Sequence, residues 1–263
     1  MKKSVLITGS SHGIGAACAL AFAREGYDVG VNYNRSPEDA MQVAEQCRAA
    51  GADVQVYQAD VSLHEDCVRM LRDFIGHFGK IDVLVNNAGG ALKMPRGGFV
   101  DMPMDYWDKQ IDLNLNAAAY CSQEAARDMI AKGVHGAIIN ISSVHSQVTW
   151  VRRKALPYSA GKAGLNMFTK SIGVELIRYG INVNCIAPGL VYTKIMSRYS
   201  DKDIEGFNRK IPAGFGGQPE DIVPMVLFLA DKSKSRFIVG QTIFIDGGQS
   251  IDGAIDNMLD EPF

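Results

Sequence analysis

Short runs of β-branched and other apolar residues alternate with longer amphipathic segments along almost the whole chain. The runs have the length of buried strands, and the segments between them have the length and periodicity of helices. This alternation predicts repeated strand–helix–strand units, and therefore a doubly wound α/β fold with helices on both faces of a parallel sheet. The seven expected strands are Ser4–Thr8, Asp28–Asn32, Asp53–Gln58, Val83–Asn86, Gly136–Ile141, Asn182–Ile186 and Thr242–Asp246.

Signals for helix ends agree with this alternation. Ser36 followed by Pro37 is typical of a helix start, and Ser62 with Glu65 has the spacing of a capping box. Four glycines follow helical patterns and precede expected strands, where a left-handed residue ends a helix. These glycines are Gly26, Gly51, Gly79 and Gly180.

Length and composition favour one large globular domain. The chain has 263 residues, of which 47% are hydrophobic and 21% charged, whereas a disordered chain would be poorer in apolar residues. Lys and Arg number 27 against 29 Asp and Glu, and neither sign clusters in a long run, which argues against a nucleic-acid binder. Since no apolar stretch approaches the roughly 20 residues of a membrane span, we expect a cytoplasmic protein without a membrane partner.

The cysteines and histidines do not indicate a metal site. The five cysteines are far apart and form no C-x-x-C pair, and no two of the five histidines have ligand spacing. We therefore expect reduced cysteines that pack in the interior, and no bound metal.

A glycine-rich turn follows the first expected strand and opens the first helix. Glycines at such a turn let backbone N–H groups and the helix N-terminus approach a pyrophosphate. The turn and the helix start contain Gly9, Ser11, His12, Gly13, Ile14 and Gly15.

This turn resembles the cofactor loop of the short-chain dehydrogenases/reductases rather than the ordinary G-x-G-x-x-G. Four further motifs of that family follow in order, and the resemblance extends from Lys3 to Gly248. It implies a single-domain Rossmann-type sheet of seven strands, with a nicotinamide cofactor across the carboxyl ends of the strands. The further motifs are Asp60-Val61, Asn86-Asn87-Ala88-Gly89, Tyr158 with Lys162, and Pro188-Gly189 with Val191 and Thr193.

The end of the second expected strand distinguishes NADP from NAD. A carboxylate there would bond the ribose 2′-hydroxyl and repel a 2′-phosphate. The family's acidic position falls on Tyr33, and Asn34, Arg35 and Ser36 follow it with donors that suit a phosphate. NADP(H) is therefore favoured, with NAD(H) as the alternative, although His12 stands where relatives that use NADP often have Arg or Lys.

Tyr158 and Lys162 lie four residues apart and so project from one face of a helix. By the family resemblance, Tyr158 is the general acid or base, because a nearby cation stabilises its phenolate. Ser143 would hold the substrate oxygen, with Ser142 as an alternative. Asn114 would link Lys162 to solvent through a water. An Asn inside a helix is also expected to bond the backbone and bend the helix, and both roles can hold at once.

These residues predict an oxidoreductase that transfers a hydride between NADP(H) and a small-molecule carbonyl or secondary alcohol. One alternative is a 3-oxoacyl-[acyl-carrier-protein] reductase, although Val134 and Tyr179 stand where such relatives have basic residues. The cations Arg152, Arg153 and Lys154 could substitute or could simply be solvated. Another alternative is a catalytically silent dinucleotide sensor, but such proteins lack the tyrosine and lysine.

The resemblance also implies a homotetramer, formed through the helices expected at Pro103–Ala131 and Tyr158–Tyr179. We expect a catalytic domain at residues 1–248 and a C-terminal tail at residues 249–263. Apolar residues recur in the tail at helical spacing, so it either frays or docks on a neighbouring subunit near the pocket. They are Ile251, Ile255, Met258 and Leu259.

Overall fold

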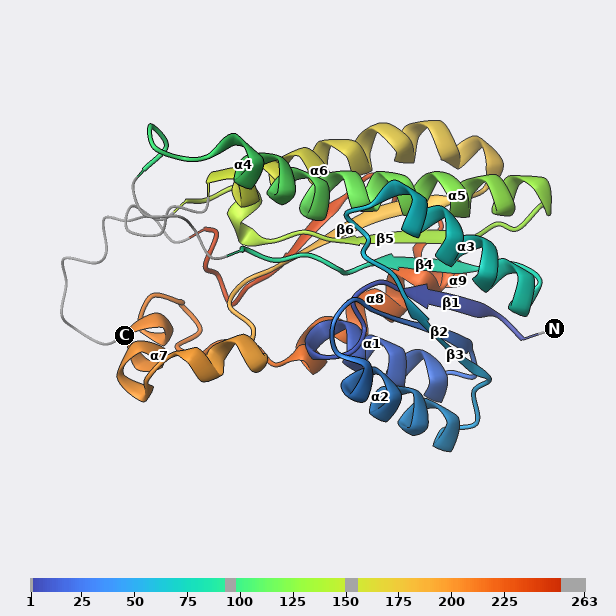
Figure 1. The fold of residues 1–263 in the computed structure, drawn as a ribbon, viewed down its shortest axis with the longest axis horizontal. Coiled ribbons are helices and arrows are strands. Elements are labelled where there is room, and N and C mark those ends of the chain that lie inside the picture. The colour runs from blue at the N-terminus through green and yellow to red at the C-terminus, as the bar shows by residue number, and fades with distance from the viewer. Residues whose placement is uncertain (1, 93–97, 150–155, 252–263) are drawn as a thin grey trace.

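The seven expected strands form one parallel sheet, in the order β3-β2-β1-β4-β5-β6-β7 (Figure 1). The computed structural model describes residues 2–92, 98–149 and 156–251. The strand predictions are confirmed to within two residues at each end. The strands are β1 Ser4–Ile7, β2 Asp28–Tyr33, β3 Val54–Gln58, β4 Val83–Asn86, β5 Ala137–Ile141, β6 Asn182–Pro188 and β7 Thr242–Ile245.

Helices cover both faces of this sheet, as expected of a doubly wound fold (Figure 1). One face carries α1 Gly13–Arg24, α2 Pro37–Ala49 and α8 Pro219–Ala230, and the other carries α3 His64–Phe78, α5 Ala117–Ala131 and α6 Leu156–Leu176. Helix α4 (Met104–Ile111) precedes α5, α7 (Asp201–Asn208) lies beyond the carboxyl ends of the strands, and α9 (Lys232–Ser235) precedes β7. In the described part of the chain no helix is long and apolar enough to cross a membrane.

The core consists of two apolar layers, one on each face of the sheet. Along β1, Val5 and Ile7 belong to the layer under α1, α2 and α8, whereas Leu6 belongs to the layer under α3 and α5. All three side chains are fully buried. A strand that is buried on both faces needs an uninterrupted apolar run, which is why these strands were recognisable in the sequence.

The predicted left-handed glycines are confirmed, but the predicted capping box is wrong. Gly26, Gly51, Gly79 and Gly180 have φ between 74° and 92°. Helix α3 begins at His64, so neither Ser62 nor Glu65 occupies its capping-box position. The N-cap position falls on Leu63, one residue later than the pattern predicted, and the Ser62 hydroxyl donates to Asp60 Oδ1 at 2.6 Å.

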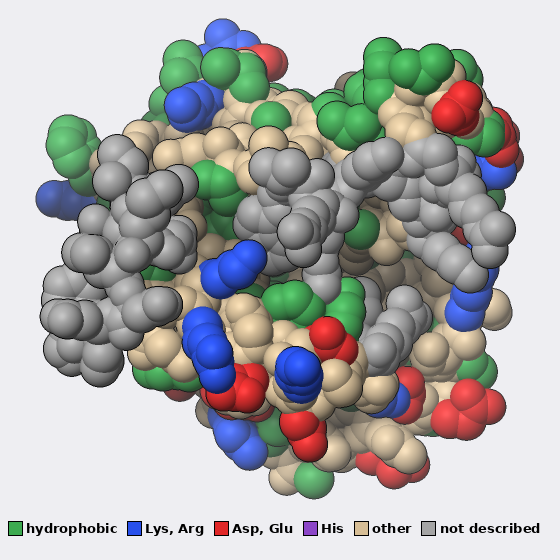
Figure 2. Space-filling model, turned by 90° about the vertical axis from the view of Figure 1, so that its left-hand side faces the viewer, with side chains coloured by type: hydrophobic (Ala, Val, Ile, Leu, Met, Phe, Trp, Pro, Cys, Tyr) green, Lys and Arg blue, Asp and Glu red, His purple; other side chains and the backbone are tan. Residues whose placement is uncertain are grey.

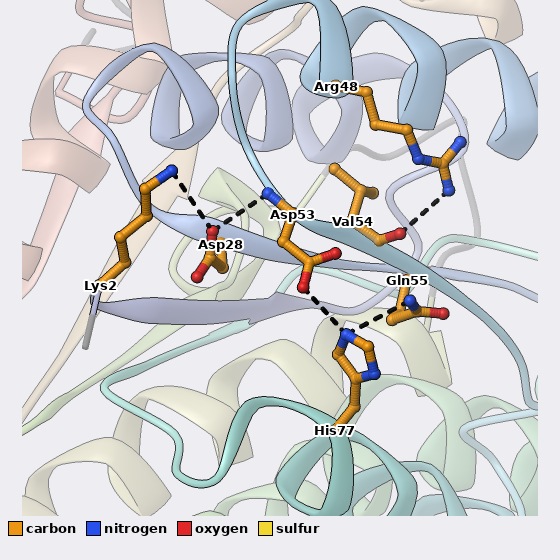
Figure 3. A network of polar contacts seen from close by, with 7 residues as sticks. All are labelled: Lys2, Asp28, Arg48, Asp53, Val54, Gln55 and His77. Atoms are coloured by element: carbon orange, nitrogen blue, oxygen red, sulfur yellow. Dashed lines mark hydrogen bonds and ion pairs between the residues drawn. The ribbon is translucent and has the colours of Figure 1, made fainter.

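A chain of polar contacts ties the amino ends of β2 and β3 to α3, at the edge of the sheet away from the strands' carboxyl ends (Figure 3). Asp28 Oδ1 accepts from the Asp53 backbone N–H at 3.0 Å and lies 3.8 Å from Lys2 Nζ. Asp53 Oδ2 lies 3.0 Å from His77 Nε2, and Gln55 Nε2 lies 3.3 Å from the same ring nitrogen. This network fixes the start of the edge strand against the end of α3.

Two sequence features lie outside the described residues: the basic stretch Arg152–Lys154, and the tail beyond Ile251. The described part of the tail, Gln249 to Ile251, forms a turn directly after β7. The five cysteines are buried and free. Among the described residues no group of three His, Cys, Asp or Glu side chains could hold a metal ion.

Packing against β2 generates a stability prediction. A Cβ on Gly30 would lie 2.7 Å from a Phe74 ring carbon and 2.8 Å from Leu6 Cδ1. Gly30→Ala should therefore lower the free energy of unfolding by about 1–3 kcal/mol through overpacking. Gly76→Ala is the matched control, because Gly76 is exposed in α3 with no atom within 4 Å of the added Cβ. It should be neutral or stabilise by up to about 1 kcal/mol. Urea unfolding of both variants measures the contrast, and equal effects would contradict it.

Candidate active site

A cleft of about 590 Å³ lies at the carboxyl ends of the strands. Figure 2 looks onto this side of the molecule, where basic and acidic side chains are interspersed on the lower half of the face. Most of the residues predicted to bind cofactor or substrate line the cleft. They are Gly9, Ser11, His12, Gly13, Ile14, Asn34, Arg35, Ser36, Asn87, Ala88, Gly89, Ser142, Ser143, Tyr158, Lys162, Pro188, Gly189, Val191 and Thr193.

Four predicted residues do not line the cleft. Gly15 and Asn114 lie behind its wall, where they support residues that line it, as described below. Asp60 and Val61 follow β3 and are also absent from the lining. The structure therefore brings most of the predicted set together and places these four outside it.

The lining also contains residues that sequence reasoning did not assign. Most of them are immediate neighbours of predicted residues, so proximity to a motif was the available signal. Gln249 follows the last motif and Met196 lies in the loop after β6, and neither carried a signal. The unassigned residues are Tyr33, Gly90, Ala91, Ile141, Val144, His145, Leu190, Met196 and Gln249.

The turn after β1 has the geometry of an anion cradle. Gly9 and Gly13 have φ of 62° and 59°, and a Cβ on Gly15 would lie 2.6 Å from Gly9 O. Helix α1 begins at Gly13, its first turn contains no acidic residue, and the side chain of His12 does not cap it. Its N-terminal N–H groups therefore remain available to an anion, and the cradle fits the pyrophosphate of a dinucleotide.

Asn32 holds this turn in place, although no motif in the sequence singled it out. Its side chain is buried at the end of β2. Asn32 Oδ1 accepts from the Gly9 N–H at 2.9 Å, while Nδ2 donates to Tyr57 O at 3.2 Å and Ala59 O at 3.3 Å. One amide thus connects the phosphate-binding turn to the ends of β2 and β3.

The far end of the cleft contains Tyr33, Asn34, Arg35 and Ser36, with no carboxylate among its lining residues. Asp60 lies near this end. Partial burial raises the pKa of Asp60, but hydrogen bonds from Ser62 and Asn34 outweigh that effect and hold the pKa below its ordinary value. The Asp60 carboxylate is therefore ionised and already engaged by donors from the protein itself.

Helix α6 places Tyr158 and Lys162 one turn apart, with the lysine 3% exposed. Lys162 Nζ donates to Ile141 O at 2.7 Å and lies 5.9 Å from the centre of the Tyr158 ring. Burial lowers the pKa of Lys162 to about 8. Burial also raises the pKa of Tyr158, an effect that its hydrogen bond with Ser143 opposes.

The two candidate serines after β5 have different environments. Ser142 Oγ donates to the backbone oxygen of Lys162 at 3.1 Å, so this hydroxyl fastens β5 to α6. Ser143 is the serine that bonds Tyr158. Its Oγ also accepts from the His145 N–H at 3.2 Å. Because the Ser143 oxygen accepts this N–H, the hydroxyl proton points elsewhere and can be donated to an oxygen in the cleft.

Asn114 lies in a single π-helical turn, Asp112–Asn116, which interrupts the helix expected at Pro103–Ala131. Its Oδ1 accepts from the Gly90 N–H at 2.9 Å, and its Nδ2 donates to Gly90 O at 3.1 Å and Gln110 O at 3.0 Å. The expectation that it bonds the backbone and distorts the helix is confirmed. A Cβ on Gly89 would lie 2.9 Å from Asn114 Oδ1 and 3.0 Å from Lys162 Nζ. Gly89 therefore lies between these two groups and leaves room for both because it has no side chain.

A ladder of buried polar side chains supports helix α6, which carries Tyr158 and Lys162. Asn86 Nδ2 donates to Asn140 Oδ1 at 2.8 Å and to Ser122 Oγ at 2.9 Å. Asn140 Nδ2 in turn donates to Thr169 Oγ1 on α6 at 2.8 Å. Because each link is buried and partnered, the ladder connects β4 and β5 to α5 and α6 in one geometry.

A doubly wound sheet, a glycine cradle for a pyrophosphate and a tyrosine–lysine pair together define an NAD(P)-dependent oxidoreductase. The comparisons with known proteins agree. A family model described as enoyl-(acyl carrier protein) reductase matches residues 9–250. The chain belongs to the short-chain dehydrogenase/reductase family.

Several relatives are similar over almost the whole chain. A 3-oxoacyl-[acyl-carrier-protein] reductase of Staphylococcus aureus is 41% identical over 249 residues, which are 94% of this chain and 98% of that protein. Acetoin dehydrogenase YohF from Salmonella typhimurium has a TM-score of 0.87 at 34% identity, with 97% of this chain and 98% of that chain covered. An acetoin dehydrogenase from Enterobacter cloacae has the same TM-score at 33% identity, covering 97% of this chain and 98% of its own.

The buried lysine generates a prediction about the cofactor-free protein. Because its folded pKa is about 8 against 10.5 ordinarily, the unfolded state binds more protons between these values, and stability rises with pH there. The wild type should therefore gain about 2 kcal/mol relative to Lys162→Met between pH 7 and pH 10. Chemical denaturation at several pH values measures this gain. A difference that stays constant over that range would contradict it.

Proposed function

We propose that this protein is an NADP(H)-preferring oxidoreductase that interconverts a small carbonyl compound and its secondary alcohol. The observation that carries the proposal is the contact between Ser143 and Tyr158 beside the buried Lys162, on the wall of a cleft that fits a dinucleotide. The bound cofactor would supply or accept the hydride at its nicotinamide ring. The chain's own residues would orient the substrate and move the proton.

Tyr158 would exchange the proton with the substrate oxygen. In the protein alone its pKa is raised, so the phenol is protonated and ready to donate during carbonyl reduction. In alcohol oxidation the phenolate would be needed, and the nearby ammonium of Lys162 would stabilise it. Ser143 would donate its proton to the substrate oxygen and hold it next to Tyr158.

The preference for NADP(H) rests on the adenosine end of the cleft. Arg35, Asn34 and Ser36 line it, and the position at the end of β2 that is acidic in NAD-dependent relatives is Tyr33. A guanidinium suits a 2′-phosphate because it presents several donors in a fixed plane. Asp60 does not line the cleft, and its carboxylate is engaged by Ser62 and Asn34.

The relatives described above support different substrates. The name of the Staphylococcus aureus relative favours a 3-oxoacyl-[acyl-carrier-protein] substrate, whereas the names of the two acetoin dehydrogenases favour a small hydroxyketone. We prefer a small substrate, because Val134 and Tyr179 carry no cation for an acidic carrier. The catalytically silent sensor is disfavoured because Tyr158 and Lys162 are both in place.

The homotetramer stays a prediction. Several apolar side chains on the outer surfaces of α4, α5 and α6 are exposed in the single chain, including Met104, Ile130, Met167 and Val174. Burial of such side chains between subunits would explain their exposure. The same helices are those through which the sequence predicts assembly.

Replacement of the tyrosine tests the reaction. Tyr158→Phe should lower turnover at least about 100-fold, because it removes the proton donor, while cofactor affinity stays near the wild-type value. Nicotinamide absorbance with a panel of ketones, hydroxyketones and 3-oxoacyl thioesters measures turnover. Ser143→Ala should lower kcat more than Ser142→Ala, whose hydroxyl faces the helix backbone. A Tyr158→Phe variant with substantial activity would overturn the assignment, and a wild type that binds cofactor without turnover would favour the sensor.

Replacement of the arginine tests the cofactor preference. Arg35→Ala should raise the KM for NADPH roughly 10- to 150-fold, because a charge-assisted hydrogen bond contributes about 1.5–3 kcal/mol. The KM for NADH should change little, which makes NADH the internal control. Steady-state kinetics with both cofactors measure the ratio. A wild-type enzyme that favours NADH would contradict the proposed preference.

A further inference from the structure

An ion pair joins two segments on opposite sides of the cleft that are 155 residues apart in the sequence. Lys194 Nζ lies 2.7 Å from both carboxylate oxygens of Asp39. Among the ion pairs of the described residues, none connects residues further apart in the sequence. The pair is therefore a long-range connection rather than a local contact along a helix.

Each partner lies within three residues of a residue that lines the cleft. Asp39 is in the first turn of α2, three residues after Ser36 at the adenosine end. Lys194 opens the short helical segment Lys194–Arg198 and follows Thr193, which lines the opposite wall. The ion pair thus connects the rim after β6 to the rim after β2.

The loop after β6 also lies against the phosphate-binding turn. Thr193 Cγ2 is 3.2 Å from the position that a Cβ on Gly13 would occupy. Where the loop begins, Val191 forms an isolated bridge with Gly217, so the two ends of the segment between them lie side by side. These contacts limit the positions that Lys194 can take, which reduces the entropic cost of forming the pair.

We propose that Lys194 and Asp39 form a clamp that closes the rim of the cofactor cleft and slows release of the bound dinucleotide. The proposal rests on the nicotinamide-dependent function described above. A dinucleotide that extends from the Tyr158 end to Ser36 would lie beneath the clamp, so its departure would require the two side chains to separate. The pair would act as a positioning element, since neither side chain lines the cleft.

Stopped-flow fluorescence tests this clamp by following release of NADPH and of NADH from the full-length protein into excess oxidised cofactor. Lys194→Ala and Asp39→Ala should each raise the release rate roughly two- to fivefold, the range that exposed ion pairs support. The double variant should release no faster than the faster single variant, because both changes remove the same interaction. Melting temperatures should stay near the wild-type value, since both side chains lie at the surface.

Lys234→Ala is the matched control. Lys234 pairs with Asp231 at 3.1 Å, and the exposed fractions of these two side chains, 64% and 35%, resemble the 66% and 29% of Lys194 and Asp39. Helix α9 precedes the start of β7, so this pair lies away from the carboxyl ends of the strands. The control variant should release both cofactors at the wild-type rate.

The outcomes separate the clamp from its alternatives. Wild-type release rates in the single variants, or additive effects in the double variant, would overturn the clamp. An effect of Lys194→Ala on NADPH but not on NADH would also overturn it, because it would show that the lysine contacts the 2′-phosphate directly. Failure of the wild type to bind either cofactor would instead overturn the nicotinamide-dependent function itself.

Discussion

The turns after β1 and β4 approach so closely that no side chain fits between them, and the rest of the site depends on this contact. A Cβ on Gly9 would lie 2.9 Å from Ala88 Cα, and one on Gly15 would lie 2.5 Å from Asn87 Nδ2. Asn87 Nδ2 in turn donates to Thr8 O and Gly9 O at 2.9 and 3.0 Å. The glycine-rich turn after β1 and the turn after β4 are consequently held together by close backbone packing and the Asn87 side-chain amide.

Buried amides extend this rigidity to the catalytic helix. Asn32 fixes the first turn from the β2 side, and the ladder from Asn86 through Asn140 to Thr169 fixes α6 from the other side. Lys162 is fully enclosed and reaches back to Ile141 O, so the sheet itself orients its ammonium group. The groups proposed to react are positioned by side chains that do not themselves line the cleft.

The sequence was sufficient to predict a strand or a turn wherever a local pattern of residues determines the local structure. Strands β1 and β4 are buried on both faces and needed apolar runs, and the turns at Gly79 and Gly180 needed positive φ. The capping box at Ser62 failed because α3 begins one residue later than the spacing implied, with Leu63 as its N-cap, and spacing alone does not fix a helix start to one residue. The ion pair of Lys194 with Asp39, and the role of Asn32, depend on segments that only the folded topology brings together.

The segment after β7 determines part of the cleft lining and so affects how the site can change in evolution. Gln249 lines the cleft, and its Oε1 accepts from the Leu190 N–H at 3.0 Å, so the segment directly after the last strand touches the loop after β6. Lys2, near the other end of the chain, lies at the amino ends of the strands, beside Asp28 at the start of β2 (Figure 3). Substitutions or insertions after β7 would therefore change the lining of the cleft without changing the residues packed against the sheet. This makes the segment a place where evolution can diversify specificity while the fold stays the same.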